Sequence, residues 1–190
     1  ILMSNPQDAP VDVTMRFLLQ DGSPIELEKT IPVKGRTTVN PAAEGIAALE
    51  NASFATVVTS DAPIVSERAM YWNTDDTVFG EGHASSGLTT TALTWSLAEG
   101  RVGGPDAYTT YILLANPQSS NASVKVTYLR ESGEAVEKTY NVQGNTRFNI
   151  DVGGMVTELQ NESFGALIEV TNEVPIAVER SMYWNSEGRF

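Results

Sequence analysis

The sequence predicts an all-β protein built from two tandem immunoglobulin-like antiparallel β-sandwich domains. A long internal repeat relates the two halves of the 190-residue chain. Within each half, runs of alternating apolar and polar residues are separated by turn residues at intervals of about 8–12 residues, which is typical of antiparallel sandwiches. Hydrophobic residues make up 41% of the chain and aromatic residues 8%, which is enough to form packed cores.

The repeat is clearest at its two ends. "ILMSNPQ" (residues 1–7) matches "ILLANPQ" (residues 112–118) at five of seven positions. "PIVSERAMYWNT" (residues 63–74) matches "PIAVERSMYWNS" (residues 175–186) at eight of twelve positions. Because order, turns and strand phase are all preserved over this length, we interpret the repeat as an internal duplication.

The repeat also sets the expected domain boundaries. The spacing of 111 residues continues to Gly22 and Gly133, and "EKTIPVKGRT" then pairs with "EKTYNVQGNT" after a two-residue deletion. A counterpart of "TWSLAEG" (residues 94–100) would precede Ile1. We therefore expect a first domain (residues 1–90) that lacks its first strand and a second domain (residues 91–190) that lacks its tail, both cut from a longer protein.

Each half contains the same succession of expected strands, about seven per unit, with "TWSLAEG" as an edge strand. Alternation with a period of two predicts half-buried strands, which are followed by turn residues at "DGSP" and "ESGE". The inward-facing residues of the first half are Val11, Val13, Met15, Phe17, Leu27, Ile31 and Val33, and those of the second are Val124, Val126, Tyr128, Val136, Tyr140 and Val142.

One segment of each half has a different pattern. "NPAAEGIAALE" offers Asn40 as a helix cap and Pro41 at the first helical position, whereas its partner "NIDVGGMVTELQ" contains two glycines. We expect a short helical turn or a loop that crosses from one sheet to the other.

The doubled string near the end of each half carries the most specific residues of the repeat. These signature residues are Glu67, Arg68, Tyr71 and Trp72 in the first copy, and Glu179, Arg180, Tyr183 and Trp184 in the second. On a strand, the Ile, Arg, Met and Trp positions share one face, which we expect to pack on the core. Each arginine then requires a carboxylate or several backbone carbonyls beside it. The alternative is that the Tyr-Trp pairs form an exposed platform on which sugars stack.

Composition excludes several classes of function. The chain has no cysteine, and its formal net charge of −12 disfavours nucleic acids and anionic membranes as partners. No apolar run approaches the roughly 18–20 residues needed to span a bilayer, so we expect no membrane insertion. The only histidine, His83, lies in "GEGHASSG", which we expect to be a glycine-rich loop between the domains, and no acid–base constellation accompanies it. We therefore expect a protein that is not an enzyme.

One acidic segment is a candidate metal site. Asp75, Asp76 and Glu81 gather oxygen ligands at the expected domain junction, where calcium would stiffen the joint. A solvated acidic loop is the alternative interpretation, and no other cofactor is expected.

Taken together, "TWSLAEG", "YILLANP", "VTYLRESG", "PIAVERSMYWN" and "GHASSG" resemble a bacterial family of tandem repeats of unknown function, found in large exported or surface-attached proteins. The resemblance implies an extracellular β-sandwich module with no catalytic residues to carry over. It favours a structural or adhesive repeat that acts as a spacer, stalk or assembly unit, with a carbohydrate-binding module as the alternative. The expected partners are neighbouring repeats, other copies that exchange strands at an open sheet edge, and glycans.

Overall fold

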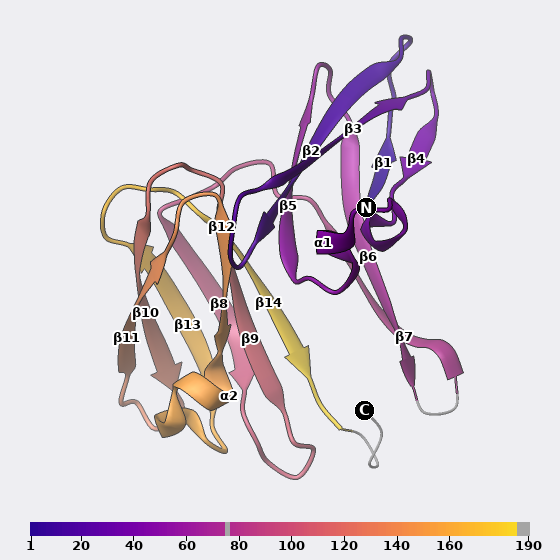
Figure 1. Ribbon diagram of the computed structural model, residues 1–190. Coiled ribbons are helices and arrows are strands. Elements are labelled where there is room, and N and C mark those ends of the chain that lie inside the picture. Colours follow the sequence, from indigo (N-terminus) through magenta and orange to yellow (C-terminus); the bar gives the residue numbers. More distant parts are fainter. Residues whose placement is uncertain (75–76, 186–190) are drawn as a thin grey trace. The chain divides into compact units, whose positions relative to one another are not determined.

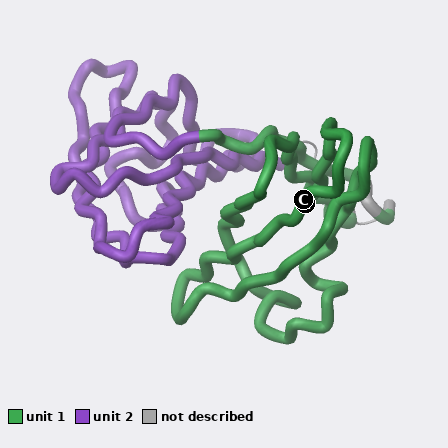
Figure 2. The backbone as a smooth tube through the Cα atoms, turned by 90° about the horizontal axis from the view of Figure 1, so that it is seen from above, with its two compact units in different colours: residues 1–89 green, residues 90–190 purple. Residues whose placement is uncertain are grey.

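The computed structural model describes residues 1–74 and 77–185 of the chain (Figure 1). The chain divides into two compact units, Ile1–Thr89 and Thr90–Phe190 (Figure 2). Each unit is a β-sandwich of antiparallel sheets with its own hydrophobic core. The predicted all-β class and the tandem arrangement are therefore confirmed.

Unit 1 contains a three-stranded sheet with the order β3-β2-β5 and a four-stranded sheet with the order β4-β1-β6-β7. Its strands are β1 (Leu2–Ser4), β2 (Val11–Leu19), β3 (Ile25–Ile31), β4 (Arg36–Thr38), β5 (Phe54–Ser60), β6 (Val65–Thr74) and β7 (Thr77–Ser86).

Unit 2 contains a four-stranded sheet with the order β11-β10-β13-β8 and a three-stranded sheet with the order β12-β9-β14. Its strands are β8 (Thr94–Arg101), β9 (Thr109–Asn116), β10 (Ala122–Arg130), β11 (Val136–Val142), β12 (Thr146–Asp151), β13 (Ser163–Val170) and β14 (Ala177–Tyr183). The segment predicted to be an edge strand, β8, does lie at a sheet edge.

The duplication extends to the strand registers. Met15 lies opposite Val58 in unit 1, and Val126 lies opposite Ile168 in unit 2. Strands β1, β2, β3, β4, β5 and β6 therefore correspond to β9, β10, β11, β12, β13 and β14. The two strands outside this scheme are β7, which pairs with β6, and β8, which pairs with β13.

The predicted two-residue deletion before "EKT" is wrong. Ile31 pairs with Val11 and Val142 pairs with Ala122, so the spacing of 111 residues continues through β3 and β11. The letters "EKT" occur in both copies by coincidence. Solvent-facing strand positions are polar in both copies, so similar polar residues recur at positions that are not equivalent. Val33 was expected to face inward, but it is 46% exposed. The reason is that β3 ends at Ile31 and Lys34, with a φ of 48°, turns the chain.

The string "NPQ" occurs in both copies because its asparagine places a buried amide at the same turn of each unit. Asn116 is fully buried, and its Nδ2 donates to the carbonyls of Ser120 (2.8 Å) and Val142 (3.1 Å), while its Oδ1 accepts from the Gln118 N–H (3.1 Å). Asn5 makes the same set of contacts 111 positions earlier, with Ala9, Ile31 and Gln7. Each asparagine thus satisfies backbone groups that the turn between β1 and β2, or between β9 and β10, would otherwise bury without partners.

The cores lie where the alternation places them. Val11, Val13, Met15 and Phe17 are at most 2% exposed. In unit 2, Tyr128 takes the position of Phe17, and its hydroxyl lies 3.1 Å from the hydroxyl of Tyr140. Both aromatic rings at this position make an edge-to-face contact with a phenylalanine, Phe54 in unit 1 and Phe164 in unit 2.

The crossings between the sheets are short helical turns, as predicted. Unit 1 has a 3-10 turn at Pro41–Ala43 followed by α1 (Ala47–Glu50), and unit 2 has α2 (Val152–Met155) followed by a 3-10 turn at Thr157–Leu159. Asn40 makes no side-chain cap, whereas the Asp151 side chain accepts from the Gly154 N–H at 3.2 Å. Within the described residues, no helix has the length and apolar character needed to cross a membrane.

Two further expectations need correction. "GEGHASSG" was predicted to be a loop, but all of its residues except Gly87 belong to β7, where Gly82 faces Tyr71 across the strand pair and leaves room for the tyrosine ring. The immunoglobulin-like prediction is matched by the layered antiparallel architecture but not by strand order. In the constant-type immunoglobulin domain the first two strands share a sheet, whereas β1 and β2 lie in different sheets, as do β8 and β9.

Candidate functional site: the signature strands and the groove beside β8

The signature strand of unit 2 is tied to β8 through its arginine. Arg180 Nη1 donates to the backbone carbonyl of Glu99 at 2.8 Å and to Glu99 Oε2 at 2.9 Å. The prediction of a carboxylate or several backbone carbonyls beside this arginine is met by the carboxylate of Glu99, which is joined by one carbonyl. The arginine side chain is 30% exposed and that of the glutamate 67%, so we expect the ion pair to contribute at most about 1 kcal/mol. Its main effect is to hold the edges of the two sheets together.

In unit 1 the signature arginine meets the only histidine of the chain. Arg68 Nη2 lies 3.4 Å from His83 Nδ1, on the neighbouring strand β7. Trp72 Nε1 donates to Glu81 Oε2 at 3.2 Å on the same pair of strands. His83 and Glu81 therefore contact signature residues of the neighbouring strand.

Burial alternates along most of β6, but not along the second half of β14, where the residues from Glu179 to Tyr183 are all half-buried. In β14, Val178 is buried, and in β6 the Arg68, Met70 and Trp72 side chains are half-buried. Tyr71 points the other way and is 65% exposed. Only the start of each string reaches a core, where Ile176 and Val178 are buried in unit 2 and Ile64 packs against the core of unit 1. The expectation that the Met and Trp positions also pack on the core is not met, and Trp184 lies beyond the end of β14.

Trp184 and Tyr108 form an exposed aromatic pair in unit 2. The Trp184 ring stacks on Tyr108, with 5.8 Å between ring centres and an angle of 26° between planes, and Trp184 is 50% exposed. The Arg101 guanidinium lies over the other ring of this pair, with Cζ 5.0 Å from the Tyr108 centre. Tyr183 and Tyr111 make a separate edge-to-face contact at 6.1 Å.

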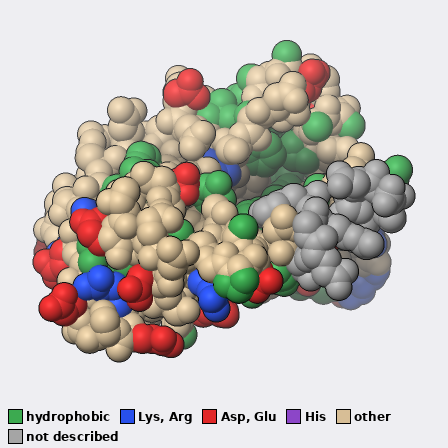
Figure 3. Space-filling view, turned by 90° about the horizontal axis from the view of Figure 1, so that it is seen from below, with side chains coloured by type: hydrophobic (Ala, Val, Ile, Leu, Met, Phe, Trp, Pro, Cys, Tyr) green, Lys and Arg blue, Asp and Glu red, His purple; other side chains and the backbone are tan. Residues whose placement is uncertain are grey.

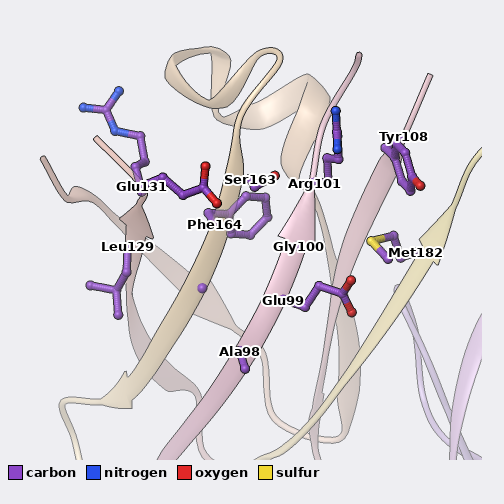
Figure 4. A pocket seen from close by; sticks show the side chains of 12 residues that line it. Ala98, Glu99, Gly100, Arg101, Tyr108, Leu129, Glu131, Ser163, Phe164 and Met182 are labelled. Carbon is purple, nitrogen blue, oxygen red and sulfur yellow. The ribbon is translucent and has the colours of Figure 1, made fainter. Parts of the chain in front are cut away.

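A groove of about 390 Å³ lies beside these residues. Figure 4 shows Arg101 and Tyr108 side by side at one end of it and Glu131 toward the other. Phe164 and Met182 supply apolar surface, and Glu99 lines it as well. Charges of both signs therefore surround an apolar centre. The wider surface has the same character, since acidic and basic side chains are intermixed in the face shown in Figure 3.

The floor of this groove depends on a glycine that sequence reasoning did not explain. A Cβ atom at Gly100 would lie 2.4 Å from Phe164 Cζ, so only glycine allows the phenylalanine ring to lie against β8. The glycine of "TWSLAEG" is explained by a packing contact across the sheet, which spacing along the chain does not encode. Arg101 and Tyr108 were missed for the same reason.

The structure describes only one of the three residues of the candidate calcium site. Asp75 and Asp76 lie outside the described residues, and Glu81 accepts a hydrogen bond from Trp72. Among the residues that the structure describes, no group of three or more histidine, cysteine or acidic side chains is arranged to hold a metal ion. The calcium site therefore stays a prediction.

The comparisons with known proteins concern the fold alone. No family model and no curated protein matches the chain, so membership of a repeat family stays a prediction. The Anabaena sensory rhodopsin transducer is similar with a TM-score of 0.42 and 19% identity, over 50% of this chain and 92% of its own. A Thermotoga maritima protein designated 1070 is similar with a TM-score of 0.42 and 10% identity, over 52% of this chain and 96% of its own. Both similarities concern the fold of a β-rich unit and imply nothing about activity.

Proposed function

We propose that the chain is a non-catalytic structural module of a larger exported or cell-surface protein, in which repeated sandwiches act as a spacer or assembly unit. The observation that supports this most directly is that two consecutive strands, β7 and β8, belong to different units. β7 completes a sheet of unit 1, and β8, the next strand along the chain, completes a sheet of unit 2. Each unit is thus a separate body with its own core, and of these two consecutive strands one belongs to each unit, as in proteins built from tandem repeats. The immunoglobulin-like description applies to the layers of each unit and not to its strand order.

Single-molecule pulling on the 190-residue chain tests this role. A load-bearing repeat should unfold in two separate events, one for unit 1 and one for unit 2. Each event should release roughly 3.3–3.6 Å of extended chain per residue of the unit concerned. A single event that releases the whole chain would contradict the proposal, because the units would then not resist force independently.

Carbohydrate binding is the second candidate, and the Tyr108–Trp184 stack favours it. An aromatic pair with half-exposed indole beside an open groove resembles a surface on which a sugar ring stacks. Screening the chain against a glycan panel, with Trp184→Ala as the variant and Trp72→Phe as the control, distinguishes the two functions. Binding that depends on Trp184 would support the second candidate, and a panel without any binder would leave the structural role alone.

Cellular location is a separate part of the proposal. An antibody raised against the 190-residue chain should label intact cells that make the full protein as strongly as it labels lysed ones. Labelling that requires lysis would exclude the cell surface.

A further inference from the structure

Arg101 lies at one end of the groove beside β8, and its backbone is held in place by a buried hydroxyl. The Arg101 N–H donates to Thr110 Oγ1 at 2.9 Å, and this hydroxyl donates to the Arg101 carbonyl at 2.6 Å. Thr110 is fully buried. The two hydrogen bonds therefore anchor the end of β8 to the interior of unit 2 and fix the point from which the arginine side chain starts.

The guanidinium is also positioned, in a slot formed by Tyr108 and Gly104. Its Cζ lies 5.0 Å from the centre of the Tyr108 ring, a contact in which the ring attracts the cation. A Cβ atom at Gly104 would lie 2.9 Å from Arg101 Nη2, and the φ of 77° at this residue favours glycine as well. The Gly104 N–H donates to Asn161 Oδ1 at 3.0 Å. The loop thus leaves room for the guanidinium and is itself tied to a neighbouring turn.

This positioned charge has no counterpart in the described part of the chain. The Nε of Arg101 is shielded from solvent without a hydrogen-bond partner among the described residues, and none of them forms an ion pair with the guanidinium. The nearby charges differ in this respect, since Arg130 donates to the Glu134 carbonyl at 2.7 Å and Glu99 is paired with Arg180. Half-buried charges in proteins are normally paired. A fixed, unpaired guanidinium in a groove therefore indicates a place for an anionic group of a ligand.

The neighbouring rings indicate what carries this anionic group. The half-exposed Trp184 indole stacks on the same Tyr108 ring that contacts Arg101. A hexuronate, which is a sugar whose sixth carbon is a carboxylate, presents an apolar ring face and an anionic group on one small molecule. The face stacks on an exposed indole. The carboxylate accepts two parallel hydrogen bonds from an arginine.

The acidic side chains limit the ligand to one carboxylate. Figure 4 shows Glu131 toward the end of the groove opposite Arg101. A second carboxylate on an adjoining sugar would approach Glu131, and the net charge of −12 repels polyanions in general. Sugar hydroxyls, by contrast, donate hydrogen bonds to a carboxylate. The groove is therefore suited to one acidic residue joined to neutral ones.

We propose that the groove beside β8 binds a single hexuronate residue of an otherwise neutral glycan, with its carboxylate on Arg101 and its ring on Trp184. Thr110 and Gly104 are positioning residues that hold the arginine in place. The inference deepens the carbohydrate-binding candidate and rests on it.

Two matched disaccharides test the proposal, namely glucuronate linked to xylose and the methyl ester of the same molecule. Each is titrated into the 15N-labelled 190-residue protein, and the indole N–H signal of Trp184 is followed by NMR. We expect the acid to shift this signal saturably. The ester keeps the ring and loses the charge, so it should bind at least about tenfold more weakly.

Variants show which side chain reads the charge. Arg101→Gln should weaken binding of the acid at least about tenfold and change the affinity for the ester by less than about twofold, so that the two ligands then bind alike. Arg36→Gln, which removes one positive charge from unit 1, is the control and should keep the preference for the acid. Trp184→Ala, followed through backbone amide signals, should weaken both ligands equally. Because the acid and the ester are compared on the same variant, a general loosening of the loop cannot produce a selective loss of the acid.

Several results would overturn the proposal. These are equal affinity of the parent protein for acid and ester, a preference for the acid that survives in Arg101→Gln, and no signal shift at millimolar disaccharide. Acetate that binds as tightly as the disaccharide would overturn the assignment to a sugar. Polygalacturonate that binds more tightly per sugar residue than the disaccharide would overturn the limit to one carboxylate.

The inference and the carbohydrate-binding candidate fail separately. If neutral glycans bind through Trp184 and the acid gains nothing over its ester, the candidate function stands and this inference is wrong. If the acid binds through Arg101 and Trp184→Ala has no effect, the anion site stands and the stacking platform of the candidate function is wrong.

Discussion

At the scale of single residues, the two units differ most in a buried pair of phenols. Tyr128 and Tyr140 share a hydrogen bond in the core of unit 2. Burial first, and then the contact with Tyr140, raises the pKa of Tyr128 above its ordinary value of 10.0. Burial also raises the pKa of Tyr140. The corresponding positions in unit 1 hold Phe17 and Lys29, so this phenol pair is confined to unit 2.

Alkaline pH should therefore destabilise unit 2. Below pH 10 the folded and unfolded states both keep the Tyr128 proton, and its contribution to stability is complete. Above that pH the unfolded chain loses the proton and the folded unit retains it, so the free energy of unfolding falls by up to about 1.4 kcal/mol per pH unit for each such group. Tyr128→Phe should make this dependence shallower. Urea titrations between pH 9 and 11 measure this dependence. They follow the fluorescence of Trp95 in a protein whose other two tryptophans are replaced by phenylalanine.

The control for this prediction is Tyr71→Phe in unit 1, which should leave the pH dependence of unit 2 unchanged. An equal slope in the Tyr128→Phe protein and the parent would show that the phenol does not carry the effect. At neutral pH the variant should lose about 1 kcal/mol, because the hydroxyl of Tyr140 is left without its partner.

At the scale of elements, β8 is held by interlocking shape rather than by charge. Gly100→Ala places a methyl group into the Phe164 ring. The ring or β8 must move, so we expect unit 2 to lose about 1–3 kcal/mol of stability. Ser96→Ala, an exposed change on the same strand, should cost less than about 0.5 kcal/mol. Chemical denaturation of the three proteins measures the difference, and equal stability of both variants would contradict this account of the glycine.

The elements that sequence reasoning placed correctly are those whose cause lies along the chain. Alternation located β2 and β10, and the repeat located the signature strands. The failures have causes that act across the chain. The deletion was misplaced because the letters "EKT" occur in both copies, although these residues do not occupy equivalent positions in the two sheets. The glycines of β7 are typical of a loop and led to that prediction. In the structure, however, Gly82 accommodates the ring of Tyr71. The partner of Arg180 was predicted by chemical type, but its identity as Glu99 depends on how the sheet edges meet.

At the scale of the whole molecule, separate cores predict separate unfolding. Met15 and Val126 occupy matching positions, and both are fully buried. Met15→Ala should destabilise unit 1 by about 2–5 kcal/mol through the cavity it leaves. Scanning calorimetry should therefore show one transition shifted down and the other unmoved, while Val126→Ala shifts only the other one. If either change moved both transitions equally, the units would share one cooperative fold.

The buried asparagines at the first turn of each unit have a consequence for chemical ageing. Asparagine decays when the amide nitrogen of the next residue attacks its side chain to close a five-membered imide. Asn5 and Asn116 are each followed by proline, whose ring nitrogen carries no hydrogen and cannot make that attack. The two amides that anchor the fold are therefore protected from slow conversion to aspartate by this route.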